Sequence, residues 1–244
     1  MNAIETRALT RTFGSITAVD HLNLVVDEGE LFALLGVNGA GKTTAIRMLC
    51  GLLPPTSGDA LLLGQSVVSE SAAARALVNV SPQETAVAAG LTARENLEFI
   101  AGIYGMRRAE ARSAADEMIA RLGLEPVAKR RAKQLSGGWQ RRLSIAMGLI
   151  TRPKILFLDE PTLGLDVLAR RELWQVIEAL RGKMTVVLTT HYLEEAEALS
   201  DRIGIMAHGQ LKALGTAGEL IERTGAKNFE DAFIALAAGE EAMA

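Results

Sequence analysis

The chain of 244 residues has little of several features that would assign it to a particular class of protein. A single cysteine, Cys50, excludes an intrachain disulfide and argues against a cysteine-built metal site. The net charge of −3 offers no electrostatic basis for non-specific binding to nucleic acid, so no nucleic-acid partner is expected. No run approaches the ~18 apolar residues of a membrane span. The start, MNAIETRALT, lacks the basic-then-apolar pattern of a signal peptide, so we expect a protein of the cytosol.

What is present is an alternation of short apolar runs with helical stretches. The 49% of hydrophobic and 23% of charged residues are typical of a globular protein with a substantial core. Strands separated by helices predict a parallel sheet with helices on both faces. The expected strands are Ile4–Leu9, Leu22–Val26, Leu31–Leu35, Ala60–Leu63, Leu77–Val80, Ile155–Leu158, Met184–Leu188 and the hairpin Ile203–Met206 with Gln210–Leu214. The helices expected beside them are Lys42–Gly51 and Val167–Leu180.

Two other stretches have helical periodicity. Between Thr92 and Leu122 one apolar face is formed by Leu97, Ile100, Ala101 and Tyr104, and another by Met118, Ile119 and Leu122. This predicts a helical insertion at about 84–150. Near the end of the chain, Phe229, Ala232, Phe233 and Leu236 predict an amphipathic helix capped by Asn228, in a short helical extension at about 215–244 whose last residues, Ala237–Ala244, are expected to fray.

The loop GVNGAGKTT, between an expected buried strand and an expected helix, carries the strongest chemical signal. Its spacing G-x-x-x-x-G-K-[ST] is that of a phosphate-binding loop, in which glycines let backbone N–H groups approach an anion. Lys42 can reach the β- and γ-phosphates, and the Thr43 hydroxyl can ligate Mg²⁺. The loop residues expected to contact a nucleotide are Gly36, Asn38, Gly39, Ala40, Gly41, Lys42, Thr43 and Thr44.

Two adjacent carboxylates, Asp159 and Glu160, follow the apolar strand Ile155–Leu158. Open α/β sheets bind ligands at the carboxyl ends of their strands, which is where these side chains would lie. Asp159 would hold Mg²⁺, and Glu160 would act as the general base that polarises an attacking water. Gln83 and His191 each follow another expected strand of this sheet, so both should reach the same edge.

Ser136, Gly137 and Gly138 are expected at the start of a helix. A hydroxyl, exposed N–H groups and the helix dipole can form a second anion cradle, although an ordinary Ser-Gly-Gly helix entry is the alternative. The chain would then have two cradles but only one set of groups for Mg²⁺ and water. A cradle completed by the opposite subunit of a dimer resolves this mismatch.

Four other residues have an aromatic, thiol or basic side chain whose role depends on its burial. Phe13, upstream of the phosphate loop, can stack on a base for about 1–3 kcal/mol, and a core position on an edge strand is the alternative. Cys50 is interpreted as a small buried hydrophobe. Arg141 and Arg142 are expected to be solvated or ion-paired rather than catalytic.

Together these motifs resemble, in order, those of the nucleotide-binding subunits of ABC transporters, from about Ile4 to Leu236. GVNGAGKTT resembles the Walker A loop, LFLDEP the Walker B strand, and LSGGW the signature sequence usually written LSGGQ. Gln83 matches the Q-loop glutamine, His191 the switch histidine and Phe13 the aromatic residue that stacks on adenine. Gly164-Leu165-Asp166 looks like the D-loop. Val37 stands where proline is common, and Trp139 departs from the signature, so Trp139 is left out of the phosphate contacts.

The resemblance implies one nucleotide-binding domain over residues 1–244. Its fold would be α/β: a RecA-like P-loop NTPase core with an N-terminal antiparallel β portion and an inserted α-helical subdomain. ATP and Mg²⁺ would be the cofactors. The implied catalytic residues are Glu160, His191 and Gln83, and the implied metal ligands are Thr43, Gln83 and Asp159. Nucleotide contacts beyond the loop are Phe13, Val19, Ser136, Gly137 and Gly138.

The same resemblance implies an ATP-hydrolysing subunit that powers export through a separate transmembrane permease. It would pair with a second nucleotide-binding subunit, as a homodimer, and lie peripherally on the cytoplasmic face of the plasma (inner) membrane. The segment LTARENL, the GGWQRR signature and the ending NFEDAF look like the exporter branch that serves drugs, sodium, polysaccharides and lipids. The alternatives are an importer subunit or a soluble ABC ATPase of translation or DNA repair.

Overall fold

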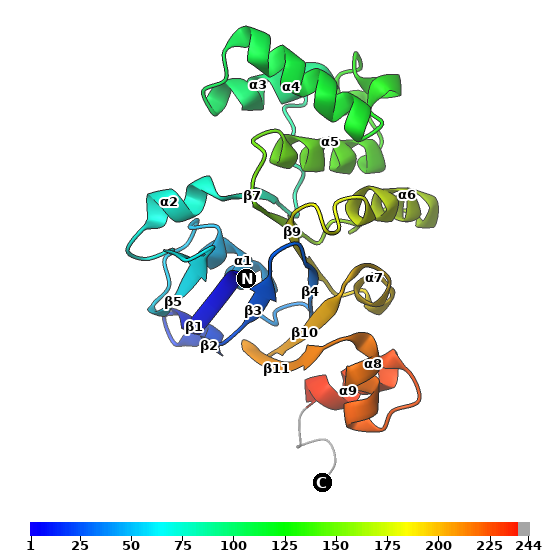
Figure 1. Cartoon of the computed structure of the whole chain (residues 1–244). Helices are drawn as coiled ribbons and strands as arrows, with labels where there is room; N and C mark the ends of the chain where they lie inside the picture. The colour runs from blue at the N-terminus through cyan, green and yellow to red at the C-terminus, as the bar shows by residue number, and fades with distance from the viewer. Residues whose placement is uncertain (239–244) are drawn as a thin grey trace.

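The computed structural model describes residues 1–238, and its central element is a mostly parallel sheet (Figure 1). Its strands are β4 (Leu31–Leu35), β7 (Val78–Ser81), β8 (Ile155–Asp159), β9 (Thr185–Thr190), β10 (Arg202–Ala207) and β11 (Gln210–Gly215). They lie in the order β11-β10-β4-β9-β8-β7, and β11 alone is antiparallel to its neighbour. The predicted RecA-like core is therefore confirmed. The strand before the phosphate loop, β4, has the expected bounds Leu31–Leu35.

Strand β4 shows why the sheet is covered on both faces. All five of its residues are buried, because alternate side chains enter two different cores. Leu31, Ala33 and Leu35 pack with residues of α5 (Gly137–Leu149), α6 (Val167–Glu178) and α7 (Leu193–Leu199). Phe32 and Leu34 face the core shared with α1 (Lys42–Leu49) and the antiparallel strands.

The antiparallel sheet differs in detail from the expected one. It contains β1 (Asn2–Phe13), β2 (Ile16–Leu22), β3 (Val25–Asp27), β5 (Ser57–Leu62) and β6 (Gln65–Ser66), with α2 (Ser71–Ala76) after it. The expectation of a single strand at Leu22–Val26 is wrong, because β2 ends at Leu22 and β3 begins at Val25. Between them, the side-chain oxygen Oδ1 of Asn23 accepts a hydrogen bond from Ala8 N at 2.8 Å. The β1–β2 hairpin turns at Gly14, whose φ of 58° is left-handed.

The helical insertion contains α3 (Ala93–Ile103), α4 (Arg108–Arg121), short 3₁₀ turns at Glu125–Val127 and Ala132–Gln134, and α5. The helix α3 starts with a capping box, in which Glu95 N donates to Thr92 Oγ1 at 3.1 Å and Thr92 N to Glu95 Oε2 at 2.8 Å. Leu97 and the α4 residues expected on an apolar face are buried. Tyr104 is 57% exposed, contrary to expectation, because it caps α3 and lies outside its last turn.

The chain continues past the sheet into two helices, α8 (Ala217–Thr224) and α9 (Phe229–Ala238). The expected cap of α9 is present, since Asp231 N donates to Asn228 Oδ1 at 2.8 Å. Phe229 and Ala232 are buried against the sheet core, as expected of an amphipathic helix. The predicted fraying falls mostly on residues 239–244, outside the described residues, while Ala237 and Ala238 belong to α9.

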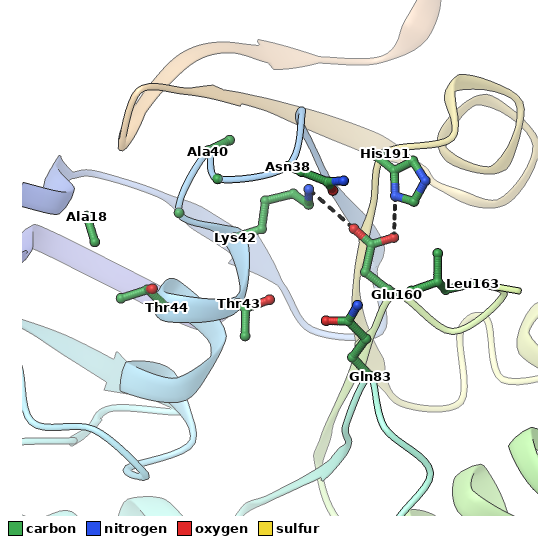
Figure 2. A pocket seen from close by; sticks show the side chains of 12 residues that line it. Ala18, Asn38, Ala40, Lys42, Thr43, Thr44, Gln83, Glu160, Leu163 and His191 are labelled. Carbon is green, nitrogen blue, oxygen red and sulfur yellow. Dashed lines mark hydrogen bonds and ion pairs between the residues drawn. The ribbon is translucent and has the colours of Figure 1, made fainter.

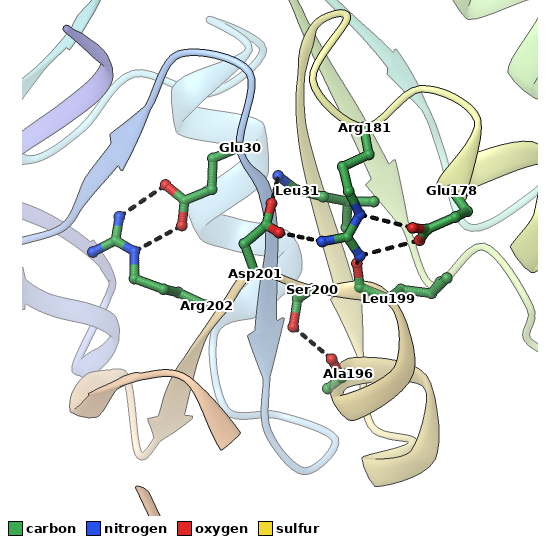
Figure 3. Close-up of polar contacts among 9 residues, drawn as sticks. All are labelled: Glu30, Leu31, Glu178, Arg181, Ala196, Leu199, Ser200, Asp201 and Arg202. Atoms are coloured by element: carbon green, nitrogen blue, oxygen red, sulfur yellow. Dashed lines mark hydrogen bonds and ion pairs between the residues drawn. The ribbon is translucent and has the colours of Figure 1, made fainter. Parts of the chain in front are cut away.

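A network of ion pairs lies at the amino ends of the parallel strands (Figure 3). Arg202 donates from Nε and Nη2 to the two oxygens of Glu30, each at 2.8 Å. Arg181 binds both Glu178 and Asp201, and Asp201 Oδ2 accepts from Leu31 N at 2.8 Å. This end of the sheet is thus fastened by charges that are paired within the protein.

No helix within residues 1–238 combines the length and the apolar character needed to cross a membrane.

Candidate functional site

A pocket of about 420 Å³ lies at the opposite edge, where β4, β8 and β9 reach their carboxyl ends (Figure 2). It is lined by Ala18, Asn38, Gly39, Ala40, Gly41, Lys42, Thr43, Thr44, Gln83, Glu160, Leu163 and His191. Ala18 and His191 lie 173 positions apart in the sequence but line the same pocket. His191 follows the parallel strand β9, and Ala18 belongs to β2, which lies against the loop at Gly41. The edge predicted for the phosphate loop, Gln83, Glu160 and His191 is the one they occupy.

The loop after β4 owes two of its glycines to packing within the protein. A Cβ on Gly36 would lie 2.3 Å from the carbonyl oxygen of Met206, and one on Gly41 would lie 2.3 Å from that of Ala18. Gly41 also has a φ of 102°, which side-chain-bearing residues rarely adopt. At Gly39, by contrast, a Cβ would meet open space, so its φ of 84° is what requires glycine there.

The Lys42 ammonium is almost fully enclosed by this loop. The side chain is 5% exposed, and Nζ donates to the carbonyl oxygens of Gly36 at 2.6 Å and Val37 at 3.2 Å. It also lies 3.3 Å from Glu160 Oε1. The cation is therefore held at the N-terminus of α1, beside Glu160, the one carboxylate among residues 1–238 that lines the pocket.

Glu160 is held between Lys42 and His191, as Figure 2 shows. Its second oxygen, Oε2, lies 2.7 Å from His191 Nδ1. Glu160 is 5% exposed and takes a left-handed φ of 49°, which is maintained by bonds from its N–H to the carbonyl and hydroxyl oxygens of Thr189, at 3.2 and 3.0 Å. A buried carboxylate with a histidine and a lysine on its two oxygens is an arrangement suited to proton transfer from water.

Thr43 and Asp159 meet beside this group. Thr43 Oγ1 donates to Asp159 Oδ1 at 3.1 Å, and Thr189 Oγ1 donates to the same oxygen at 2.5 Å. No cation of residues 1–238 lies within ion-pair distance of Asp159, which is 5% exposed. Hydroxyl and carboxylate oxygens are the donors that Mg²⁺ prefers, so this pair fits the metal role predicted for it.

Gln83 enters the pocket from the loop after β7, and Arg141 of α5 holds that loop. Arg141 donates to the carbonyl oxygens of Pro82 at 2.6 Å and Gln83 at 2.5 Å. Arg141 is 4% exposed, so the expectation of a solvated or ion-paired side chain is wrong for this residue. For Arg142 it holds, since Nη2 lies 3.1 Å from Glu172 Oε2 and the guanidinium stacks over Trp139.

The predicted cradle stands apart from the pocket. Ser136 is the N-cap residue of α5, and Ser136 and Gly137 are exposed. The Ser136 side chain makes no capping hydrogen bond, so the usual reason for a serine at this position is absent. None of Ser136, Gly137 and Gly138 lines the pocket that holds Lys42 and Glu160.

Two other expected contacts lie outside the pocket lining. Phe13 is 46% exposed at the end of β1, with the Arg11 guanidinium 4.6 Å from its ring centroid, so the alternative of a core phenylalanine is wrong. The side chain of Val19 is fully buried, and Ala18 lines the pocket instead. Successive residues of a strand face opposite ways, so a one-residue shift exchanges the two.

Leu163 and the buried acid Glu195 were not anticipated. Leu163 lines the pocket because the turn after Glu160 is closed by its N–H bonding the Glu160 carbonyl at 3.2 Å. Glu195 is fully buried on α7, where Oε1 accepts from Trp174 Nε1 at 3.1 Å. Burial raises the pKa of Glu195 despite the hydroxyls of Thr190 and Thr162 nearby.

Cys50 is 5% exposed, and burial raises the pKa of its thiol, as expected of a small buried hydrophobe.

Comparisons with known proteins identify relatives that match most of the chain, including the pocket. The sequence pattern of the ABC transporter family matches residues 19–163. "Daunorubicin/doxorubicin resistance ATP-binding protein DrrA" of Streptomyces peucetius is 44% identical over 91% of this chain and 68% of its own. "Probable multidrug ABC transporter ATP-binding protein YbhF" of Escherichia coli is also 44% identical, over 89% of this chain, which spans only 38% of that relative.

Solved structures agree. A structure described as an ATP-binding subunit of an ABC transporter superposes with a TM-score of 0.83 at 27% identity, over 96% of this chain and 99% of that one. A dimeric ATP-binding cassette bound to ADP and Pi superposes with a TM-score of 0.77 at 28% identity, over 87% of this chain and 98% of that one.

Proposed function

The chain belongs to the ABC transporter family, and on that premise we propose that it binds and hydrolyses MgATP to power export through a separate membrane permease. The observation that carries the proposal is the contact of Glu160 with both Lys42 and His191 in one pocket, at 3.3 and 2.7 Å. A carboxylate, an ammonium group and a histidine thus surround one volume. Such a combination serves the hydrolysis of a phosphoanhydride.

In this proposal each residue has a defined task. Backbone N–H groups of residues 36–44 and Lys42 hold the phosphates, and Glu160 accepts the proton of the attacking water. His191 keeps the Glu160 carboxylate oriented through their 2.7 Å contact. Gln83 completes the wall of the pocket on the side of the helical insertion.

Thr43 and Asp159, with Gln83, would hold Mg²⁺. The metal would neutralise charge on the phosphates, which is the chemistry it supplies in phosphoryl transfer. Residues 1–238 contain no group of three or more His, Cys, Asp and Glu side chains arranged so that they could hold a metal ion by themselves. That agrees with Mg²⁺, which is commonly bound through one or two protein ligands together with substrate phosphates.

The cradle at Ser136–Gly138 would act on a nucleotide held by a second copy of the chain. Its exposure, its uncapped hydroxyl and its absence from the pocket of its own subunit all support this assignment. The matched cassette described as dimeric supports a pairing of two such subunits. Phe13 would stack on the base, and its exposed ring beside Arg11 is compatible with that role.

Export is favoured over import by the relatives, whose names refer to multidrug transport and to daunorubicin and doxorubicin resistance. The permease would be a separate protein, and this chain would attach to it on the cytoplasmic face of the membrane.

The test of hydrolysis is phosphate release from purified protein supplied with MgATP, compared with the Glu160→Gln variant. The proposal requires turnover by the wild type and its loss in the variant. Export is tested in vesicles that contain a candidate permease: ATP must drive transport only when this chain is added.

The cradle is tested by mixing two inactive variants, Lys42→Ala and Gly137→Asp. Gly137 is a better probe than Gly138, because a Cβ on Gly138 would already lie 3.1 Å from Ala169 of its own chain, whereas one on Gly137 lies at an ordinary 3.5 Å from Leu165. A mixed dimer has one site with both lesions and one with neither. Activity should partly return on mixing, and the double variant mixed with itself should stay inactive.

Light scattering of Gly137→Asp with ATP provides the second measurement. The proposal requires that this variant bind ATP as a monomer yet fail to dimerise. Normal ATP-dependent dimerisation would contradict a cradle that acts on the partner's nucleotide.

A further inference from the structure

Arg141 is a buried cation without a carboxylate partner in the part of the chain that the structure describes. Its guanidinium makes no ion pair within 4 Å there, and the residue is 4% exposed. Burial lowers its pKa, partly offset by the charges of Asp159 and Glu195 at longer range. Such a placement is costly unless the N–H groups have acceptors, so what Arg141 binds matters to the fold.

Its acceptors are two consecutive backbone carbonyls of the loop that carries Gln83. One terminal nitrogen donates to Pro82 O at 2.6 Å and the other to Gln83 O at 2.5 Å. The planar fork of a guanidinium fixes two acceptors relative to each other, which a single ammonium cannot do. The contact therefore fixes the backbone from which the Gln83 side chain enters the pocket.

The helix that supplies Arg141 is the one that begins at the cradle. Arg141 follows Gly138 by three residues on α5, so it lies about one turn from the exposed N-terminus. A second bond joins the same helix to the same strand end, since Ser144 Oγ lies 2.8 Å from Ser81 Oγ and both side chains are buried. The cradle and the Gln83 loop are thus attached to one rigid element.

We infer that Arg141 is a positioning residue: it fixes Gln83 to the helix whose N-terminus forms the Ser136–Gly138 cradle. The inference rests on the proposed function. Because that cradle would meet the nucleotide of the partner subunit, a shift of α5 on engagement moves Gln83 in the pocket of its own subunit. Arg141 thereby links the two nucleotide sites of a dimer through a path of one helix turn and two hydrogen bonds.

The experiment is a double-mutant cycle with Arg141→Met and Gln83→Ala, measured as kcat and KM for MgATP. Displacement of one positioned group by about 1 Å can cost up to about 100-fold in rate, so Arg141→Met is expected to lower kcat about 10- to 100-fold. KM should change less than about threefold, because the phosphate-binding Lys42 is untouched. In the Gln83→Ala background the same replacement should lower kcat by no more than about twofold, because the residue through which it acts is already gone.

Controls separate positioning from simple fastening of the helix. Ser144→Ala removes the other bond between α5 and β7 but leaves the Gln83 carbonyl bound, and its kcat should stay within about threefold of the wild type. Arg141→Lys should fall between wild type and Arg141→Met, because one ammonium replaces a fork. Thermal unfolding and binding of a fluorescent ATP analogue confirm that each variant is folded.

Hydrogen exchange of the backbone at residues 83–88, which include the Ala88 N–H bonded to Asn96 Oδ1, tests the attachment without nucleotide and independently of hydrolysis. Exchange there should accelerate in Arg141→Met and not in Ser144→Ala. Unchanged exchange, or losses of kcat that multiply in the double variant, would overturn the inference. A wild type that hydrolyses no MgATP while exchange still accelerates would refute the proposed function instead.

Discussion

The two ends of the parallel sheet are both rich in charge, yet they satisfy that charge in different ways. At the amino ends, Glu30 and Arg202 meet through two bonds of 2.8 Å, and Arg181 bridges two acids. At the carboxyl ends, Asp159 is bonded to hydroxyls alone, and Arg141 to carbonyls alone. The charges at the amino ends are therefore paired within the protein. At the carboxyl ends Lys42 and Glu160 pair at 3.3 Å, while Asp159 and Arg141 have no ion-pair partner within residues 1–238.

The difference identifies the functional end without reference to sequence motifs. A charge in a close two-bond ion pair attracts a ligand weakly, whereas a buried charge held by neutral dipoles retains its electrostatic attraction. Asp159 is such an acid beside the pocket. Lys42, in the pocket lining, is held by two carbonyl oxygens in addition to its 3.3 Å contact with Glu160. Phosphates and a divalent cation would complete the pairing.

The largest effect that tests this comparison is expected for Glu160→Gln. If Glu160 is the general base that we propose, its removal should lower turnover about 10²–10⁴-fold while ATP still binds, because Lys42 and the loop remain. The variant should then accumulate as an ATP-bound dimer, which size-exclusion chromatography would detect. Its matched control is Glu30→Gln at the amino end, which should leave turnover unchanged. Turnover of Glu160→Gln within about threefold of the wild type would contradict the assignment.

Phe13 extends the comparison to the antiparallel sheet, where binding would use an aromatic face rather than charge. Loss of a stack worth about 1–3 kcal/mol should raise the dissociation constant for ATP about 5- to 150-fold in Phe13→Ala. Phe13→Trp should bind nearly as the wild type does. The measurement is equilibrium titration with a fluorescent ATP analogue, and normal affinity in Phe13→Ala would remove the residue from the site.

At the amino end the expected effect is on stability alone. Arg202→Met would leave the carboxylate of Glu30, a residue 8% exposed, without its cation, and an unsatisfied buried group costs about 1–3 kcal/mol. Urea denaturation should report this loss, while kcat and KM stay unchanged. A change in KM of Arg202→Met with unaltered stability would contradict the assignment of a purely structural role to the amino ends of the strands.

The smallest effect concerns Glu195, whose pKa is raised by burial from an ordinary value of 4.5. An acid with a raised pKa in the folded state binds its proton more tightly there, so its stabilising contribution is complete below the pKa of the unfolded chain and is lost as pH rises towards the folded value. Glu195→Gln cannot titrate. Its melting temperature should therefore rise relative to that of the wild type as pH increases above about 4.5. A constant difference between the two curves would show that Glu195 ionises normally.

Residues that meet within a continuous motif were predictable, because their local spacing already implies the contact. The strand Leu31–Leu35, the loop after it and the pair Asp159-Glu160 needed only the rule that ligands bind at the carboxyl ends of parallel strands. His191 and Gln83 followed from the same rule, since each ends a strand of that sheet. The parallel topology of the sheet was therefore sufficient to predict most residues of the pocket.

Residues whose environment depends on distant backbone were not predictable. Arg141 can be buried because the carbonyls of Pro82 and Gln83, 59 and 58 positions earlier, accept its hydrogen bonds. The sequence around Arg141 does not indicate this contact. Val19 was implied only by the resemblance. The strand β2, which contains both Ala18 and Val19, was not predicted, so the sequence did not indicate which of the two faces the pocket. The helix α8 lies within the helical extension expected at about 215–244. Its start was not predicted, although Thr216 and Glu219 form a capping box that their spacing alone indicates.

The close approaches at Gly36 and Gly41 have a consequence for affinity. Carbonyl groups of the protein itself already lie where a Cβ would go, so the loop is held in shape before any nucleotide arrives. A ligand that meets a preorganised loop forfeits little conformational entropy on binding, since the chain gave up that freedom on folding. Replacement of either glycine should therefore impair folding first and nucleotide affinity only in consequence.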